Sequence, residues 1–322
     1  MKKVIITGGL GFIGSNIAKK FVKKGYKVKI IDNLDPDSGA NLYNIYDFRD
    51  KVELIRASIL DYNKIFKHIK NTNLIINCAA STSHNLSMKD PMKNLDVNIK
   101  GVLSILEAIK NSNRKIKIIQ IGTTTQIGNQ INNITDETHP EFPKDMYSAN
   151  KMAAEKYVMI YCNSYNIPGA VVRLPNTYGP RAAIDNSELT FNNYFIGLAI
   201  QKKKIPVFGN GNQMRNIIFV EDAVNAIYLI SLKNLKNPLV LLAAGNKHYS
   251  LRHIAETTSK FIGGKVIHKP WPKQLKNNEI GDVKLSNKNI KKFIDWQPVI
   301  NLQQGIKLSK EFFMKNKKHY LM

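Results

Sequence analysis

Hydrophobic residues in the first half of the chain occur in short runs, and longer segments with a helical spacing of apolar and polar residues separate these runs. Short buried strands that alternate with helices indicate a parallel sheet with helices on both faces. We therefore expect an α/β fold with a doubly wound parallel sheet, in which ligands bind at the carboxyl ends of the strands. The expected strands are 4–7, 28–32, 52–56, 74–78, 116–121 and 170–174.

The pattern becomes looser after the sixth run, where proline and glycine divide the chain into short pieces. We expect residues 1–175 to form the doubly wound domain and residues 176–322 to form mainly a smaller C-terminal lobe that binds the substrate. Two pieces near 216–245 are expected to return to the first domain, namely a helix-like segment at 220–232 and an apolar run at 239–244.

A glycine-rich segment, TGGLGFIG at residues 7–14, joins the first expected strand to the first expected helix. In a dinucleotide site one glycine makes the tight turn, another lets the backbone approach a pyrophosphate, and the last, here Gly14, lets the helix pack closely on the strand. The pyrophosphate then lies at the positive end of the helix. A tight turn without a ligand can have the same glycines, so this segment alone is a weak signal.

The second expected strand ends in Asp32, about 20 residues farther on, where an acid can hydrogen-bond the hydroxyl groups of the adenosine ribose. The two features together predict a dinucleotide-binding domain of the Rossmann type. A carboxylate at this position would repel the additional phosphate of NADP, and no arginine follows it, so NAD is the expected cofactor. Residues 33–47, which are rich in Asn and Asp, are expected to form a long loop after this strand.

The composition is typical of a globular protein, with 322 residues and 43% hydrophobic content, but the net charge is +24. A charge of this size can indicate a nucleic-acid or membrane binder. Here the lysines are scattered and form no arginine-rich or aromatic stripe, so neither partner is expected. A diffuse positive field would still attract an anionic nucleotide substrate.

The two cysteines, Cys78 and Cys162, lie in a strand-like and a helix-like run, which suits buried thiols in a reducing compartment better than a disulfide framework. No metal site is expected. No apolar run approaches the roughly 18 residues of a membrane span, and the apolar run after Met1 is too short for a signal peptide. We therefore expect a cytoplasmic protein.

Tyr147 and Lys151 are one helical turn apart at the start of an expected helix. A phenol has a pKa of about 10, but a nearby ammonium group and the charge of an oxidised nicotinamide would stabilise its phenolate and lower that pKa. Tyr147 could then accept the proton of a sugar hydroxyl while a hydride leaves the same carbon. A surface Tyr and Lys at this spacing are common, so the pair alone is weak evidence.

The fifth expected strand is followed by GTTTQIG at residues 122–128, which would place hydroxyl groups beside the cofactor. A threonine can hydrogen-bond a reacting oxygen or the tyrosine, although it is not itself a useful acid or base. Without Tyr147, a threonine-rich strand end with no catalytic role would be the better interpretation.

These segments together resemble the extended short-chain dehydrogenase/reductase family of nucleotide-sugar epimerases and dehydratases, from Lys3 to about Gly305. The resemblance places the catalytic roles on Thr123, Tyr147 and Lys151. It implies substrate contacts by Thr123, Thr124, Tyr147, Asn176 and Arg215. It implies a cofactor site of Gly8, Gly11, Phe12, Ile13, Gly14, Asp32, Asn33, Ser58, Ile59, Cys78, Ala79, Ala80, Asn98, Tyr147, Lys151 and Pro175.

Two substrate motifs support this resemblance. Asn176 lies in RLPNTYGP at residues 173–180, which is similar to the family segment whose asparagine contacts the nucleotide-sugar. Arg215 matches the arginine that holds the diphosphate, and a guanidinium can contact phosphate oxygens in a bidentate manner. Asp222 is interpreted as a helix cap. The family motif WQP at 296–298 is interpreted as a packing feature.

Departures from the family pattern narrow the expected reaction. Dehydratases of the family have an Asp-Glu pair after the catalytic threonine, because removing water requires an acid and a base. Here these positions are Thr124 and Thr125, and the glutamate of the family's decarboxylases is also missing. By elimination, a 4-epimerase is expected, which oxidises C4 and returns the hydride to the other face. The family's late arginine is absent, with only Lys273 and Lys276 in that region.

Two alternatives remain open. One is a reductase or dehydratase that acts on a 4-keto or 6-deoxy nucleotide-sugar. The other is a non-catalytic NAD-binding sensor or scaffold, which the fold also permits. The resemblance further implies a homodimer formed by the helices that hold Asn98 and Tyr147, although their outer faces could equally pack inside a monomer.

Overall fold

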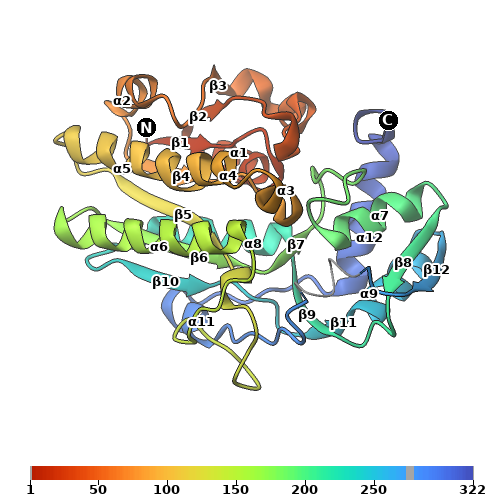
Figure 1. Ribbon diagram of the computed structural model, residues 1–322. Coiled ribbons are helices and arrows are strands. Elements are labelled where there is room, and N and C mark those ends of the chain that lie inside the picture. The colour runs from red at the N-terminus through yellow and green to blue at the C-terminus, as the bar shows by residue number, and fades with distance from the viewer. Residues whose placement is uncertain (1, 273–278, 322) are drawn as a thin grey trace.

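The computed structural model describes residues 2–272 and 279–321 and contains a large parallel sheet beside a smaller lobe (Figure 1). The strand order of the large sheet is β10-β6-β5-β4-β1-β2-β3, and every pairing is parallel, which confirms the predicted doubly wound α/β fold. The order reverses between β1 and β4, and a ligand site is expected at that point. The strands are β1 (Lys3–Thr7), β2 (Lys27–Asp32), β3 (Val52–Arg56), β4 (Leu74–Asn77), β5 (Lys117–Thr123), β6 (Gly169–Leu174) and β10 (Leu239–Leu242).

Helices cover both faces of this sheet. On one face α1 (Phe12–Lys23), α8 (Val220–Leu232) and α11 (Lys288–Ile294) share a single hydrophobic core. On the other face α2 (Tyr62–Ile69), α5 (Gly101–Asn111) and α6 (Met146–Ser164) share a second core. Segments after residue 176 therefore complete the large sheet and its helical layer, because β10 pairs with β6 and α8 packs beside α1. The shorter α3 (His84–Lys89), α4 (Pro91–Leu95) and a π-helical segment, Asp96–Lys100, lead into α5.

The smaller lobe has two short sheets and its own core around Tyr178, Phe219 and Phe313. The first sheet has the order β11-β9-β7 and the second pairs β12 with β8. Its strands are β7 (Asn176–Tyr178), β8 (Lys204–Phe208), β9 (Met214–Phe219), β11 (His248–Ser250) and β12 (Lys265–Lys269). Its helices are α7 (Phe191–Ile200), α9 (Leu251–Phe261) and α12 (Leu302–Lys315).

Two local predictions were wrong. The expected loop 33–47 contains a 3-10 turn, Pro36–Ser38, and the start of a 3-10 segment, Leu42–Lys51. Asn41 initiates the second because its side chain accepts a hydrogen bond from the Tyr43 amide at 2.9 Å. Asp222 does not cap α8; instead its carboxylate accepts the Ile300 amide at 2.9 Å and ties a distant segment to the helix. In both cases a side chain bonds a backbone group that spacing does not identify.

Trp296 is buried at 4% exposure and donates its indole N–H to the Asp222 carbonyl, so its interpretation as a packing residue is confirmed. Within residues 2–272 and 279–321, no helix combines the length and the apolar character that crossing a membrane requires.

Candidate active site

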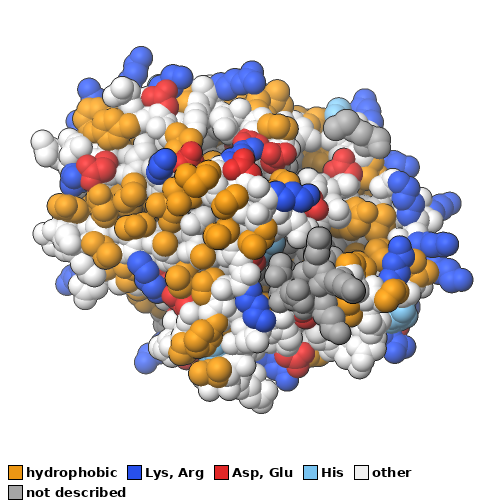
Figure 2. All heavy atoms as spheres, viewed as in Figure 1, with side chains coloured by type: hydrophobic (Ala, Val, Ile, Leu, Met, Phe, Trp, Pro, Cys, Tyr) orange, Lys and Arg blue, Asp and Glu red, His pale blue; other side chains and the backbone are white. Residues whose placement is uncertain are grey.

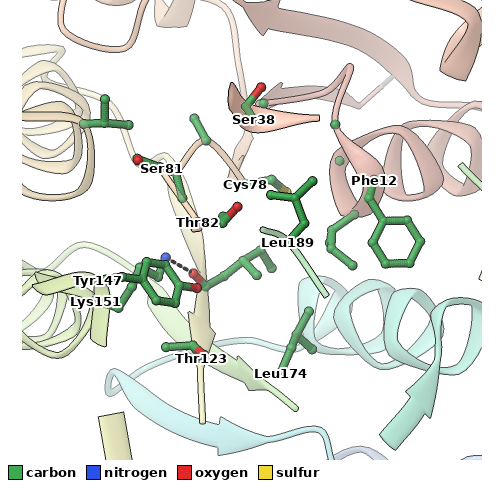
Figure 3. A pocket seen from close by; sticks show the side chains of 18 of the residues that line it. Phe12, Ser38, Cys78, Ser81, Thr82, Thr123, Tyr147, Lys151, Leu174 and Leu189 are labelled. Carbon is green, nitrogen blue, oxygen red and sulfur yellow. Dashed lines mark hydrogen bonds between the residues drawn. The ribbon is translucent and has the colours of Figure 1, made fainter. Parts of the chain in front are cut away.

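A pocket of about 280 Å³ opens at the carboxyl ends of the central strands, between the large sheet and the smaller lobe. Its wall contains every residue predicted for the cofactor except Asn98, and every residue predicted for catalysis or substrate except Arg215. Figure 3 shows Tyr147 and Lys151 together on one side of this pocket, near Thr123, with Phe12 on the other side. The folded chain thus brings together segments that are more than 160 residues apart in the sequence.

The glycine-rich turn is shaped for close backbone approach. Gly8 has a φ of +64°, and a Cβ at this position would lie 2.7 Å from the Ala79 amide nitrogen. A Cβ on Gly14 would collide with the Gly8 carbonyl oxygen. The N-terminus of α1, which follows, has neither a capping side chain nor an acidic residue in its first turn. Its amide groups are therefore suited to a pyrophosphate, and the segment fits a dinucleotide.

Asp32 holds the adjoining loop from the end of β2. Its two carboxylate oxygens accept the Leu10 amide at 2.9 Å and the Leu34 amide at 2.8 Å. Burial raises the pKa of Asp32, while these two hydrogen bonds oppose the rise. The carboxylate lies in the pocket wall beside the glycine-rich turn.

Thr123 ends β5 and begins a chain of hydroxyl groups. Its Oγ1 lies 3.1 Å from Thr125 Oγ1, which in turn accepts a hydrogen bond from the Ser148 hydroxyl at 2.9 Å. Ser148 belongs to α6, so this chain fixes the end of β5 to the helix that carries Tyr147. The Thr123 hydroxyl can consequently reach both the tyrosine and a bound sugar.

Tyr147 and Lys151 are buried at the start of α6. Burial raises the pKa of Tyr147 to about 12, although a hydrogen bond with the Thr123 side chain opposes the rise. Burial also lowers the pKa of Lys151 to about 8. The Lys151 ammonium donates to the Ile121 carbonyl at 2.6 Å, the hydrogen bond that Figure 3 marks with a dashed line. The pair is therefore held in place by β5.

The carbonyl that positions Lys151 belongs to a buried polar row that crosses the sheet. Thr7 donates to Asn77, Asn77 donates to Gln120 at 2.7 Å, and Gln120 donates to the Ile121 carbonyl at 3.2 Å. Since polar groups inside a parallel sheet need partners, this row both satisfies itself and links β1 to the lysine. In the sequence these residues are isolated polar positions within apolar runs, so the pattern did not predict that they bond to one another.

Two predicted residues lie outside the pocket wall. Asn98 is buried in the π-helical segment, where its side chain accepts the Ser81 amide at 3.1 Å and donates to the Ser81 carbonyl at 2.9 Å. It therefore shapes the strand exit that lines the pocket. Arg215 is held by the Glu279 carboxylate at 2.6 Å and the Gly281 carbonyl at 2.6 Å. Lys273 and Lys276 lie outside the described residues.

Cys78 lines the pocket and is partly exposed, whereas Cys162 is buried in the core. Neither thiol forms a disulfide. Burial raises the pKa of each thiol to about 12. These thiols are consequently protonated at neutral pH and act as apolar wall and core, as the sequence predicted for Cys162.

A buried charged cluster supports the loop behind Thr123. Arg173 on β6 contacts the Glu155 carboxylate at 2.8 and 2.6 Å and also contacts Glu141. Gln126 donates to both carboxylates, at 2.8 Å to Glu141 and 3.2 Å to Glu155. Burial raises the pKa of Glu155, but the hydrogen bond and charge of Arg173 outweigh it and lower the pKa overall. The loop is thus tied to α6 and β6 together.

The sequence analysis missed His84 and Asp145. His84 begins α3 and lines the pocket, and its Nδ1 lies 2.7 Å from an Asp145 carboxylate oxygen. Its ring meets the Tyr147 ring edge to face at a centroid distance of 4.9 Å. A helix cap at Asp145 was detectable from its position before α6, but no local signal identifies a partner 61 residues away.

Comparison with known proteins shows which family this chain resembles. Residues 5–309 match the family model described as GDP-mannose 4,6 dehydratase. A Methanocaldococcus jannaschii protein named "Putative UDP-glucose 4-epimerase" is 30% identical over 94% of this chain and 96% of its own length. The human dTDP-D-glucose 4,6-dehydratase is 27% identical over 98% of this chain and 91% of its own.

A solved structure has the same overall fold. The UDP-glucose 4-epimerase of Thermotoga maritima, determined with UDP-glucose, is 25% identical and covers 98% of this chain and 99% of its own, with a TM-score of 0.89. The chain therefore belongs to the GDP-mannose 4,6-dehydratase family, among the nucleotide-sugar epimerases, dehydratases and decarboxylases of the extended short-chain dehydrogenase/reductase type.

Proposed function

We propose that the protein is an NAD-dependent 4-epimerase of nucleotide-diphosphate sugars. The observation that carries this proposal is the placement of Thr123, Tyr147 and Lys151 in one pocket with the glycine-rich turn, while threonines occupy positions 124 and 125. Because these two positions carry no carboxylate, the end of β5 supplies no acid and base for removing water from C5 and C6. Proton transfer at one carbon is the chemistry that remains.

The residues present fit NAD. Gly8 and Gly14 have no Cβ to block the backbone, and the N-terminus of α1 has no capping side chain, so this turn offers a pyrophosphate site. The Asp32 carboxylate offers a ribose site in the same pocket wall. When bound, NAD supplies reversible hydride transfer. Asp32 favours NAD over NADP, because a buried carboxylate repels a phosphate group on the same ribose.

In this proposal Tyr147 accepts the proton of the sugar 4-hydroxyl and later returns it. Thr123 orients that hydroxyl, since its own hydroxyl is fixed between Thr125 and the tyrosine. A phenol with a pKa of about 12 stays protonated at neutral pH, so an adjacent cation is required to stabilise the phenolate that accepts the proton. Lys151 supplies a cation at this depth, held by the Ile121 carbonyl.

The test is proton NMR of UDP-galactose, and then of other nucleotide-sugars, incubated with the purified protein and no added cofactor. We expect signals of the C4 epimer to grow over many turnovers with the wild type and to be absent with Tyr147→Phe. No conversion across the panel by protein that contains NAD would contradict the proposal. Stoichiometric use of NADH on a 4-keto nucleotide-sugar would identify a reductase instead.

We further propose that two copies of the chain associate through α4, α5 and α6. Figure 2 shows hydrophobic side chains gathered over these helices at the left of the view. Met92 on α4 (63%) and Ile160 on α6 (55%) are exposed by more than half, and so is Met88 (51%) near the end of α3, which precedes α4. Light scattering should give the mass of a dimer for the wild type and of a monomer for Met92→Asp/Ile160→Asp. A monomeric wild type would refute the dimer.

A further inference from the structure

His84 and Asp145 form a pair at the sugar end of the pocket that the proposed chemistry does not use. His84 Nδ1 lies 2.7 Å from Asp145 Oδ2, and the Asp145 side chain is only 10% exposed. The His84 side chain is 39% exposed and lies in the pocket wall. One ring nitrogen is thus fixed by a buried carboxylate while the ring remains open to a ligand.

The carboxylate determines the orientation of the imidazole. A ring whose Nδ1 donates to a carboxylate presents Nε2 on its opposite edge. Within residues 2–272 and 279–321, no hydrogen bond to His84 Nε2 is formed. The edge-to-face contact with Tyr147 also restricts rotation of the ring. His84 therefore offers an oriented polar atom next to the catalytic tyrosine.

The pair is connected to the catalytic helix by backbone contacts. Asp145 also caps α6, because its Oδ1 accepts the Ser148 amide at 2.8 Å. The Tyr147 amide donates to the Ser87 hydroxyl at 3.1 Å, and Ser87 belongs to α3, which begins at His84. A displacement of His84 relative to Tyr147 would have to break these contacts. The position of Nε2 is consequently fixed relative to the phenol.

The surrounding wall indicates what kind of group His84 can bind. Among the described lining residues the basic side chains are His84 and Lys151, and Lys151 already donates to a carbonyl. The lining residues include the neutral Ser81, Thr82, Thr125 and Asn176, and the residues that flank His84, Ser83 and Asn85, both donate to the Glu188 carboxylate. A wall of hydroxyl and amide groups around one imidazole matches an uncharged hydroxylated ring. Among the described lining residues, a negatively charged sugar would find the Asp145 carboxylate next to His84, the basic side chain that is not already bonded to a carbonyl.

We propose that His84 binds a hydroxyl group of the substrate sugar and that Asp145 is the positioning residue that holds it. His84 is then a substrate-contacting residue that selects which sugars turn over, in addition to Thr123 and Tyr147. This inference rests on the proposed function, because it requires a nucleotide-sugar in the pocket. The sugar class it indicates is a neutral hexose with a free hydroxyl next to the reacting carbon.

The test is calorimetric titration of UDP-glucose, UDP-galactose and UDP into the NAD-containing protein. His84→Phe retains a ring against Tyr147 but has no polar atom, so it should weaken binding of the sugar nucleotide that the wild type prefers by about tenfold. It should leave the affinity for UDP unchanged, since UDP lacks the hexose whose hydroxyl His84 would contact. A UDP-sugar that lacks the contacted hydroxyl should bind wild type and His84→Phe equally well.

Two substitutions at Asp145 separate its role as a cap from its role toward His84. Asparagine and serine both cap helices well, but only asparagine also reaches His84. We expect Asp145→Asn to bind the sugar nucleotide nearly as well as the wild type and Asp145→Ser to lose about threefold. The matched control is Asp61→Ser, which changes the cap of α2, where the Lys64 amide is the partner. It should change nothing in the titration.

Equal affinity of wild type and His84→Phe for every sugar nucleotide would overturn this inference and leave the proposed function intact. An equal loss for UDP and UDP-sugars would also overturn it, because it would indicate a distorted pocket. If no nucleotide-sugar binds the wild type, both the inference and the proposed function fail. Retention of NAD and an unchanged thermal midpoint verify that each variant is folded.

Discussion

The two ends of the pocket are built in different ways. At the cofactor end, Asp32 contacts Leu10 and Leu34, which lie 22 and 2 residues away in the sequence. At the sugar end, the Tyr147 amide contacts Ser87 at a separation of 60 residues, and Ser83 contacts Glu188 at a separation of 105. The glycine-rich turn and Asp32 of the first end belong to one continuous unit, β1-α1-β2, whereas the second end is assembled from four or more segments.

This difference determines how a substitution at each end affects the protein. The cofactor end relies on steric freedom at glycines and on backbone amides, which are properties of a local motif. The sugar end relies on buried charges and hydroxyl groups that satisfy one another across elements, so removing one partner leaves another unsatisfied. We therefore expect substitutions of the buried charged groups at the sugar end to alter stability, and substitutions at the cofactor end to alter mainly cofactor affinity.

The largest effect is expected for Tyr147→Phe. Removing the phenolic oxygen deletes the proton acceptor, so turnover should fall at least about a thousandfold. NAD content and thermal midpoint should change little, because the ring retains its contact with His84. Rates are measured by NMR and NAD by absorbance after release. Turnover above a tenth of the wild-type rate would assign the proton transfer to another group.

Arg173→Met should cost about 3–5 kcal/mol of unfolding free energy, because Glu155 loses its buried cation and keeps only the half-exposed Lys156 ammonium at 3.2 Å. In the wild type, Arg173 depresses the pKa of Glu155, so its contribution is present above the ordinary value of 4.5 and is lost as pH falls through the folded-state pKa. In the variant, burial dominates and raises this pKa. The variant should therefore become more stable as pH falls from 7 to 5, whereas the wild type should not.

Urea unfolding at several pH values measures how the unfolding free energy of the wild type and of Arg173→Met changes with pH. Lys156→Met removes the exposed cation that contacts Glu141 at 2.9 Å and Glu155 at 3.2 Å; it is the control for losing a solvent-screened cation from the same cluster and should cost under about 1 kcal/mol. Parallel pH profiles for Arg173→Met and the wild type would show that Glu155 does not depend on Arg173.

Lys151→Met should stabilise the NAD-free protein at pH 7 while it abolishes turnover. The folded-state pKa of about 8 lies below the ordinary 10.5, so charging the buried amine opposes folding. This penalty is fully present below pH 8 and disappears above pH 10.5, and its upper limit is about 3 kcal/mol. The lost hydrogen bond to Ile121 reduces the gain.

Denaturant unfolding at pH 7 and pH 10 tests whether Lys151→Met is more stable than the wild type at the lower pH. Lys67→Met, on the exposed face of α2, is the control. A destabilised Lys151→Met at pH 7 would mean that the hydrogen bond to Ile121 outweighs the cost of burying the charge. The stability of this part of the sugar end would then come from the catalytic residue itself.

The smallest effect is expected at the cofactor end. Asp32→Asn retains one acceptor for the Leu10 and Leu34 amides, so the loop should fold, but NAD should bind about tenfold more weakly. The preference for NAD over NADP should shrink at the same time, because the repelling charge is gone. Fluorescence titration with both cofactors gives the two affinities. An unchanged preference would place cofactor selection elsewhere in the pocket.

The strands and the glycine-rich turn lie where the sequence predicted them. The six expected strands are all present, with ends that differ by at most two residues. All predicted cofactor residues except Asn98 line the pocket, because a glycine turn, a strand and a helix are specified by neighbours in the chain. The sugar end was predicted only in part: Thr123, Tyr147 and Lys151 were identified, while His84, Asp145 and the Arg173 cluster were not.

The sequence by itself determined the parallel sheet, the glycine-rich turn and the choice of an acid at Asp32, since short-range spacing encodes each of them. Tertiary structure alone decided that α11 returns to the large sheet, that Arg215 lies against Glu279, and that His84 meets Asp145. The physical reason is that hydrogen bonds and ion pairs depend on distances of about 3 Å between side chains. Patterning along the chain fixes which face a residue occupies, but the partner on that face depends on how the helices and strands pack.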